Sequence, residues 1–176
     1  MTSETSAASA SSLPLSAWHR RFGQQASWTR DLRHYLYGRL DFAQASRILE
    51  VGCGTGVLSA ELGGITSALI FGLDCRYPQL GFARQHDTST FFVQGDAQAL
   101  PYSAQLFDVV YCHYLLLWVH DPMAVLAEMR RVTRPGGVVL ALAEPDYGAR
   151  IDYPPELEPL GVWQREALRR QGAAPE

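Results

Sequence analysis

The sequence predicts an α/β domain in which a parallel sheet is covered by helices on both faces. Between residues 47 and 143, short apolar runs typical of buried strands alternate with segments in which apolar residues recur at helical spacing. The first run, Arg47 to Val51, leads straight into three glycines at alternate positions, Gly52, Gly54 and Gly56. A strand, a glycine-rich turn and a helix in this order are typical of open α/β sheets that hold a nucleotide beyond the carboxyl ends of their strands.

The chain before the first strand divides into a tail and a helical segment. Residues 1–14 are mostly Ser, Ala and Thr, which predicts a disordered tail. From about Leu15 to Leu40, apolar and aromatic residues recur every three or four positions. This pattern predicts one or two amphipathic helices, with a break near Gly23. We expect Trp18 and Trp28 to pack these helices onto the sheet.

The other elements follow in alternation. The predicted later strands are residues 68–74, 90–94, 107–112 and 138–143. The predicted helices are residues 56–62, 78–86 and 122–133, and the segment 154–171 looks helical beyond Pro159. Pro78 stands at a helix-opening position, and Asp121 is a predicted N-cap. Residues 46–176 are therefore interpreted as one domain, preceded by the helical segment 15–45.

Composition narrows the functional classes. The chain has 176 residues, of which 47% are hydrophobic and 19% charged, as in ordinary globular domains. A net charge of −3 leaves no basic field for nucleic acid. No apolar run approaches the roughly 20 residues of a membrane helix, and no signal peptide is evident. The three cysteines are unpaired in spacing, which predicts reduced thiols in the cytoplasm, and the five histidines show no metal-ligand spacing.

The spacing of the glycines distinguishes between nucleotide classes. A dinucleotide-binding loop has the pattern G-x-G-x-x-G, and here Val57 occupies the place of the third glycine. The pattern present is Glu50-x-Gly52-x-Gly54-x-Gly56. It resembles motif I of the class I S-adenosylmethionine (SAM)-dependent methyltransferases, of the methyltransferase type 11-like group.

Further landmarks extend this resemblance from about Arg47 to Asp146. Asp74 ends the second strand, where the family's acidic residue takes the ribose hydroxyls. Asp96 follows the third strand, where a second acidic residue reads the adenine amino group. The segments 99–102 and 107–111 look like the family's approach to strand four, and residues 134–140 look like its turn into strand five.

The resemblance implies a Rossmann-like doubly wound sheet with parallel strand order 3-2-1-4-5. Family members usually continue with further strands, the last one antiparallel beside strand five. Residues 144–176 supply none, which predicts an exposed strand-five edge. A homodimer covering this edge, or a shortened family member, is the expected consequence. The segment 15–45 is expected to fold over the cofactor as a lid.

The resemblance also implies the cofactor, its contacts and the reaction. The implied contacts with SAM are Glu50, Gly52, Cys53, Gly54, Gly56, Asp74, Cys75, Asp96, Ala97 and Cys112, with Trp28 and possible help from Gln24 and Gln25 in the lid. The methyl group would pass by in-line displacement to a small-molecule acceptor, leaving S-adenosylhomocysteine. His113 and Tyr114, just past strand four, are the candidates for proton transfer. Glu144 and Asp146 are expected near the substrate.

Several alternatives remain open at this point. The glycines could form a tight turn without a ligand, Asp74 could cap its strand, and Glu50 could fix the loop by accepting hydrogen bonds. His113 and Tyr114 could be an aromatic pair packed beneath the lid. The whole chain could be a non-catalytic SAM-binding or interaction protein derived from a methyltransferase. A nicotinamide-dependent oxidoreductase is disfavoured by Val57.

Overall fold

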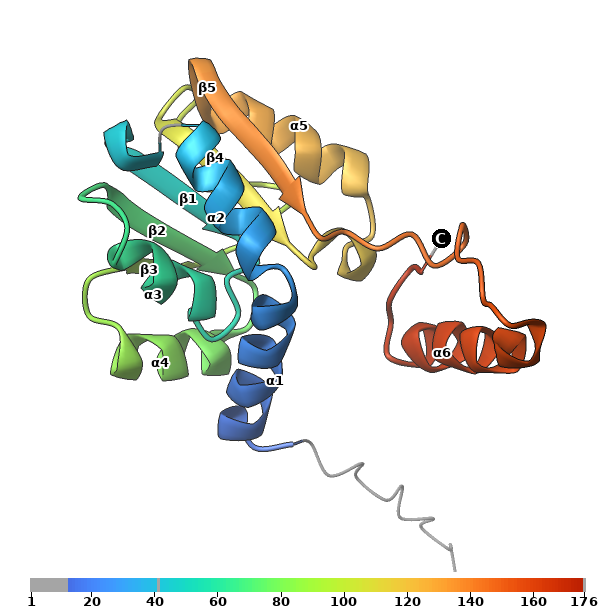
Figure 1. Cartoon of the computed structure of the whole chain (residues 1–176). Coiled ribbons are helices and arrows are strands. Elements are labelled where there is room, and N and C mark those ends of the chain that lie inside the picture. The colour runs from blue at the N-terminus through green and yellow to red at the C-terminus, as the bar shows by residue number, and fades with distance from the viewer. Residues whose placement is uncertain (1–12, 41, 176) are drawn as a thin grey trace, which may run out of the picture.

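Five strands form one parallel sheet in the order β3-β2-β1-β4-β5, as predicted. The computed structural model describes residues 13–40 and 42–175 (Figure 1), so that most of the expected tail, residues 1–12, lies outside the described residues. The strands are β1 Arg47–Val51, β2 Leu69–Asp74, β3 Phe91–Gln94, β4 Phe107–His113 and β5 Thr133–Leu142. The helices are α1 Leu15–Trp28, α2 Arg30–Arg39, α3 Val57–Gly63, α4 Tyr77–His86, α5 Pro122–Val132 and α6 Glu158–Arg170, with short 3₁₀ turns η1 Phe42–Gln44, η2 Leu116–Trp118 and η3 Pro155–Leu157.

The two faces of the sheet bury two separate cores. Successive residues of a strand point to opposite faces. Leu49 of β1 therefore packs with Val125 and Met129 of α5, whereas its neighbour Ile48 packs in a second core with Leu62 of α3. The second core also includes residues of α1, α2 and η1. The N-terminal helices thus cover the same face as α3, as Figure 1 shows.

The expected break in the N-terminal helices is present, but its predicted position near Gly23 is wrong. Helix α1 runs through Gly23, where an added Cβ would meet nothing within 4 Å. The chain leaves the helical conformation at Thr29 instead, with φ −114° and ψ 10°. The Thr29 hydroxyl lies within hydrogen-bond distance of Arg33, four positions along the chain, and of His113 at the end of β4.

The turn expected at residues 134–137 is a bulge inside β5. Phe107 pairs with Thr133 and Val109 pairs with Val138, so the residues between them on β5 are opposite Asp108 alone. Gly136 takes a φ of +75° there. The Asp108 carboxylate accepts hydrogen bonds from Arg134 Nε at 2.6 Å and from the backbone nitrogen of Arg47 at 2.7 Å. The side chain of Asp108 therefore holds the bulge against the start of β1.

Beyond β5 the chain leaves the sheet. In the part of the chain that the structure describes, β5 is an edge strand, with 37% of Val139 exposed. Helix α6 lies apart from the sheet in Figure 1. The helical interpretation beyond Pro159 is confirmed, since α6 spans Glu158–Arg170. Among the described residues, no helix is long and apolar enough to cross a membrane.

Candidate functional site

The loop between β1 and α3 takes a conformation that only glycines adopt readily. Gly52, Gly54 and Gly56 all have left-handed φ values, of +77°, +52° and +77°. The backbone nitrogens of Gly52 and Cys53 both donate to the Leu73 carbonyl, at 2.7 and 3.0 Å. The loop is therefore folded back against the end of β2, at the carboxyl edge of the sheet.

Three side chains crowd the glycines of this loop. A Cβ on Gly52 would lie 2.7 Å from Leu115 Cδ1, and one on Gly56 would lie 2.9 Å from Phe92 Cζ. A Cβ on Gly54 would lie 3.1 Å from Cε2 of Phe22. Phe22 belongs to α1, so the N-terminal segment reaches the centre of the loop.

The two predicted acidic residues lie at neighbouring strand ends. Asp74, half-buried at the end of β2, accepts hydrogen bonds from the nitrogens of Gly54 at 2.8 Å and Arg76 at 2.9 Å. Each carboxylate oxygen keeps a further lone pair for a ligand hydroxyl. Asp96 is exposed beyond β3 and accepts from the Gln98 nitrogen at 2.8 Å. Both carboxylates therefore have acceptor capacity left on the ligand-binding edge.

The remaining candidates near the loop differ in their access to solvent. Cys75 is exposed beside Asp74, whereas Cys53 and Cys112 are buried. Ala97, next to Asp96, is 8% exposed. Cys53 packs in a small apolar cluster with Leu80 and Ala83 of α4 and with Phe92.

Glu50 is a buried carboxyl group behind the loop. It is 4% exposed, and its Oε2 accepts a hydrogen bond from Ser59 Oγ at 2.5 Å. Burial raises the pKa of Glu50 to about 7. Because Ser59 belongs to α3, Glu50 ties the first strand to the helix that follows the glycine loop.

His113 and Tyr114 lie together where β4 ends. Their rings stand edge to face with centroids 4.6 Å apart. Tyr114 has a φ of +54°, which is unusual for a residue other than glycine and is typical of strained positions at functional sites. His113 Nε2 lies 2.9 Å from Thr29 Oγ1. Burial lowers the pKa of His113 to about 4, so the imidazole is neutral at pH 7.

The carboxylate of Glu144 accepts hydrogen bonds from the backbone that follows β4. Its two oxygens accept hydrogen bonds from the backbone nitrogens of Leu115 at 2.9 Å and Leu116 at 2.8 Å, at the start of η2. Cys112 Sγ donates to the same group at 3.4 Å. Asp146 is exposed and accepts from the nitrogen of Gly148. Glu144 thus holds the turn after β4, a role that only long-range contacts reveal.

The lid residues singled out from the sequence differ in exposure: Trp28 is 65% exposed, Gln24 is also exposed, and Gln25 is half-buried. Two other residues of α1 reach the loop, Phe22 and His19, which are three positions apart; His19 Nδ1 lies 2.9 Å from Thr55 Oγ1. Their spacing places them on one face of the helix, which was the signal available in the sequence.

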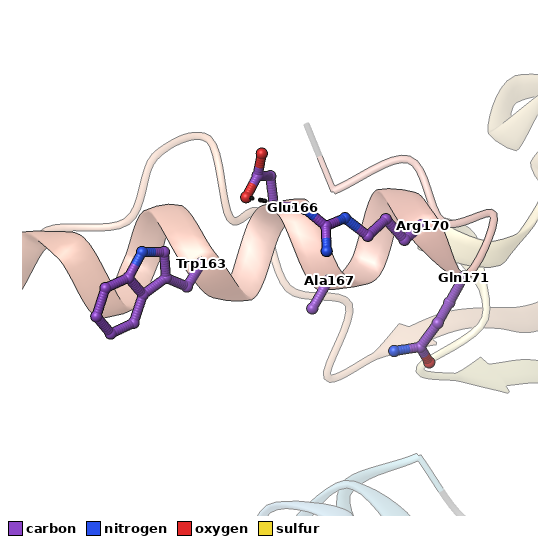
Figure 2. A pocket seen from close by; sticks show the side chains of 5 residues that line it. All are labelled: Trp163, Glu166, Ala167, Arg170 and Gln171. Carbon is purple, nitrogen blue, oxygen red and sulfur yellow. Dashed lines mark ion pairs between the residues drawn. The ribbon is translucent and has the colours of Figure 1, made fainter.

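A surface pocket lies elsewhere in the molecule. Its volume is about 390 Å³, and it is lined by Trp163, Glu166, Ala167, Arg170 and Gln171 of α6 and its end. Figure 2 shows these side chains along one helix, with Glu166 and Arg170 joined by an ion pair. No predicted site residue lines this pocket. The candidate site is therefore the glycine loop and the strand ends around it.

Comparison with known proteins gives one family. Residues 49–141, more than half of the chain, match the family described as the methyltransferase domain. The malonyl-[acyl-carrier protein] O-methyltransferase of Serratia marcescens is 34% identical over 118 residues, covering 65% of this chain and 45% of that protein. The demethylmenaquinone methyltransferase of Corynebacterium glutamicum is 35% identical over 116 residues, covering 66% and 47%. The chain thus spans about half the length of the curated relatives it matches.

Solved structures share the fold. The [4+2]-cyclase SpnF has a TM-score of 0.57 at 27% identity, over 62% of this chain and 43% of that chain. The S-adenosylmethionine-dependent methyltransferase of Mesorhizobium loti has a TM-score of 0.53 at 23% identity, over 64% and 55%.

Proposed function

Because the chain belongs to the class I SAM-dependent methyltransferase family, we propose that it binds SAM at the glycine loop and transfers the methyl group to a small-molecule acceptor. The observation that carries the proposal is the loop itself. Three left-handed glycines stand at the carboxyl edge of the sheet, and the Asp74 carboxylate is fixed against the middle one. Glycine loops at this edge of an α/β sheet are typical of nucleotide-binding sites.

The residues of the loop region suit the parts of SAM. Asp74 accepts from the ribose hydroxyls with its free lone pairs, and Asp96 with Ala97 receives the adenine. Gly52, Gly54 and Gly56 carry no Cβ between the backbone and the ligand, which takes its place there once the neighbouring side chains, Leu115, Phe22 and Phe92, adjust. Glu50 stabilises the loop from behind through Ser59. The other assigned contacts, which rest on the family pattern, are Cys53, Cys75, Cys112 and Trp28.

The protein's contribution to the reaction is alignment and exclusion of water. SAM carries a methyl group that its sulfonium already activates, so an in-line displacement needs little from the protein beyond orientation. The two relatives are named for different acceptors, one a malonyl group on acyl-carrier protein and one a demethylmenaquinone. We therefore assign a small-molecule acceptor class without choosing between them.

Calorimetric titration of the purified chain with S-adenosylhomocysteine tests the cofactor site. We expect binding in the micromolar range, and no heat of binding from a folded chain would overturn the proposal. Titration with reduced nicotinamide dinucleotide is the matched control, for which we expect no binding.

A second candidate is SAM binding without methyl transfer. It is favoured by the likeness to the [4+2]-cyclase SpnF, at 27% identity, because that protein is named for a reaction other than methyl transfer. Incubation with methyl-labelled SAM and either a demethylmenaquinone or a malonyl thioester separates the two. Tight S-adenosylhomocysteine binding with no labelled product from either acceptor would favour the second candidate.

A further inference from the structure

We propose that Thr29 and Arg33 are positioning residues that hold His113 as its neutral Nδ1–H tautomer, so that the imidazole acts as a hydrogen-bond donor and not as a proton-accepting base. Its meaning for methyl transfer rests on the proposed function, whereas the tautomer itself does not. Thr29, between α1 and α2, would thus set the protonation of a histidine at the end of β4.

The tautomer is decided by where the Thr29 hydroxyl proton goes. Arg33 has only donors, so its contact with Thr29 Oγ1 at 2.6 Å uses one lone pair of the hydroxyl oxygen. The hydroxyl proton can go to the Ala26 carbonyl at 3.4 Å, which would leave the second lone pair for an Nε2–H, or to His113 Nε2 at 2.9 Å. The Ala26 carbonyl already accepts from Arg33 at 2.5 Å and from the Thr29 nitrogen at 3.3 Å, and its contact with the hydroxyl is long, so we assign the proton to the shorter contact with His113. Nε2 is then an acceptor, and the imidazole proton lies on Nδ1.

Arg33 is too firmly held for this arrangement to relax. Its guanidinium is 1% exposed and forms two parallel hydrogen bonds with Glu61 of α3, Nε to Oε1 at 3.1 Å and Nη2 to Oε2 at 2.5 Å. Bidentate pairs of this kind fix the orientation of both groups. The donor that engages Thr29 therefore belongs to a buried ion pair that joins α2 to α3.

The surroundings also disfavour a protonated imidazole. Burial, and then the nearby positive charge of Arg33, lower the pKa of His113, while Glu61 opposes them. His113 is the last residue of β4, on the edge of the sheet where ligands bind. With Nε2 engaged by Thr29, Nδ1–H is the one remaining polar group of the ring, and it is a donor.

Nitrogen-15 NMR of the full chain tests the proposal directly. Long-range proton–nitrogen spectra distinguish the two neutral tautomers from imidazolium, and the His113 signals are those lost in His113→Asn. We expect the Nδ1–H pattern at pH 7 in the wild type and in Thr29→Ser, which keeps the hydroxyl. Thr29→Val, similar in shape but without the hydroxyl, should shift His113 toward the Nε2–H form.

The outcomes separate this proposal from the proposed function. An Nε2–H or imidazolium pattern in the wild type, or an unchanged Nδ1–H pattern in a folded Thr29→Val, would overturn the positioning role. The same samples are then titrated with S-adenosylhomocysteine. Failure to bind, together with the expected tautomer, would refute the cofactor site and leave the tautomer assignment standing.

Discussion

The backbone nitrogen of Gly54 lies 2.8 Å from Oδ2 of Asp74, so the centre of the glycine loop is hydrogen-bonded to the carboxylate that ends the next strand. The two residues are twenty positions apart. Because each holds the other, the loop conformation and the orientation of the acidic side chain are set together, before any ligand arrives.

This pairing predicts a loss of cofactor affinity in Asp74→Ala. Removing the carboxylate leaves the ribose hydroxyls and the Gly54 N–H without an acceptor, at a cost of about 1–3 kcal/mol in S-adenosylhomocysteine binding. Calorimetry measures the change. Asp87→Ala is the control. Asp87 also accepts local hydrogen bonds, from Ser89 and Thr90, but it lies before the start of β3, away from the carboxyl ends of the strands. Unchanged affinity in Asp74→Ala would remove the ribose role.

Gly54→Val should abolish S-adenosylhomocysteine binding while the chain still folds. A φ of +52° strains a β-branched residue, and its side chain would enter the space beside Phe22. Gly81→Ala in α4 is the matched control, since an added Cβ there meets nothing within 4 Å. The control should gain about 0.5–1 kcal/mol in stability and keep its affinity. Full affinity in Gly54→Val would mean that the loop is only a turn.

The raised pKa of Glu50 predicts that the free energy of unfolding depends on pH. Burial raises the pKa of its carboxyl from 4.5 to about 7, so between these values the folded state binds more protons than the unfolded state. Stability contributed by Glu50 is therefore lost as the pH rises through this window, with a slope of up to about 1.4 kcal/mol per pH unit. Glu50→Gln should remove this falling contribution to the unfolding free energy, measured by urea unfolding from pH 4.5 to 7.

The lowered pKa of His113 has the opposite effect on the unfolding free energy and provides an internal check. Its pKa falls from 6.5 to about 4, so the unfolded state binds more protons there and stability rises with pH. Glu50→Gln should therefore expose a rising curve that the wild type masks, and adding His113→Asn should flatten it. An identical pH profile in wild type and Glu50→Gln would contradict the raised pKa.

The ion pair between Arg33 and Glu61 should matter more than one on the surface. Glu61→Gln leaves the guanidinium of Arg33, which is 1% exposed, without a counter-charge, and we expect a loss of about 3 kcal/mol in unfolding free energy. Glu166→Gln breaks a pair whose side chains are 57% and 78% exposed, and should change stability by less than about 0.5 kcal/mol. Similar losses in both variants would show that burial does not set the difference.

Features with a local signal were predictable from the sequence. The apolar runs and the glycine pattern located the strands and the loop, and Asp121 caps α5 by accepting from the Ala124 nitrogen at 3.0 Å. Features made by distant residues were not. Thr29, where the helix breaks, contacts His113 eighty-four positions away, and the role of Glu144 depends on backbone groups twenty-eight and twenty-nine positions earlier. The sites of Phe22 and Leu115 over the glycines likewise required the assembled fold.

Phe22 has a consequence for any measured affinity. Its ring lies 3.1 Å from where a Cβ of Gly54 would stand, so a ligand that approaches this glycine needs the Phe22 side chain to turn away. If only a fraction of the molecules has the ring turned away, the apparent dissociation constant equals the intrinsic constant divided by that fraction. A modest affinity for S-adenosylhomocysteine would then report how firmly the Phe22 ring is held as well as the contacts that the site makes.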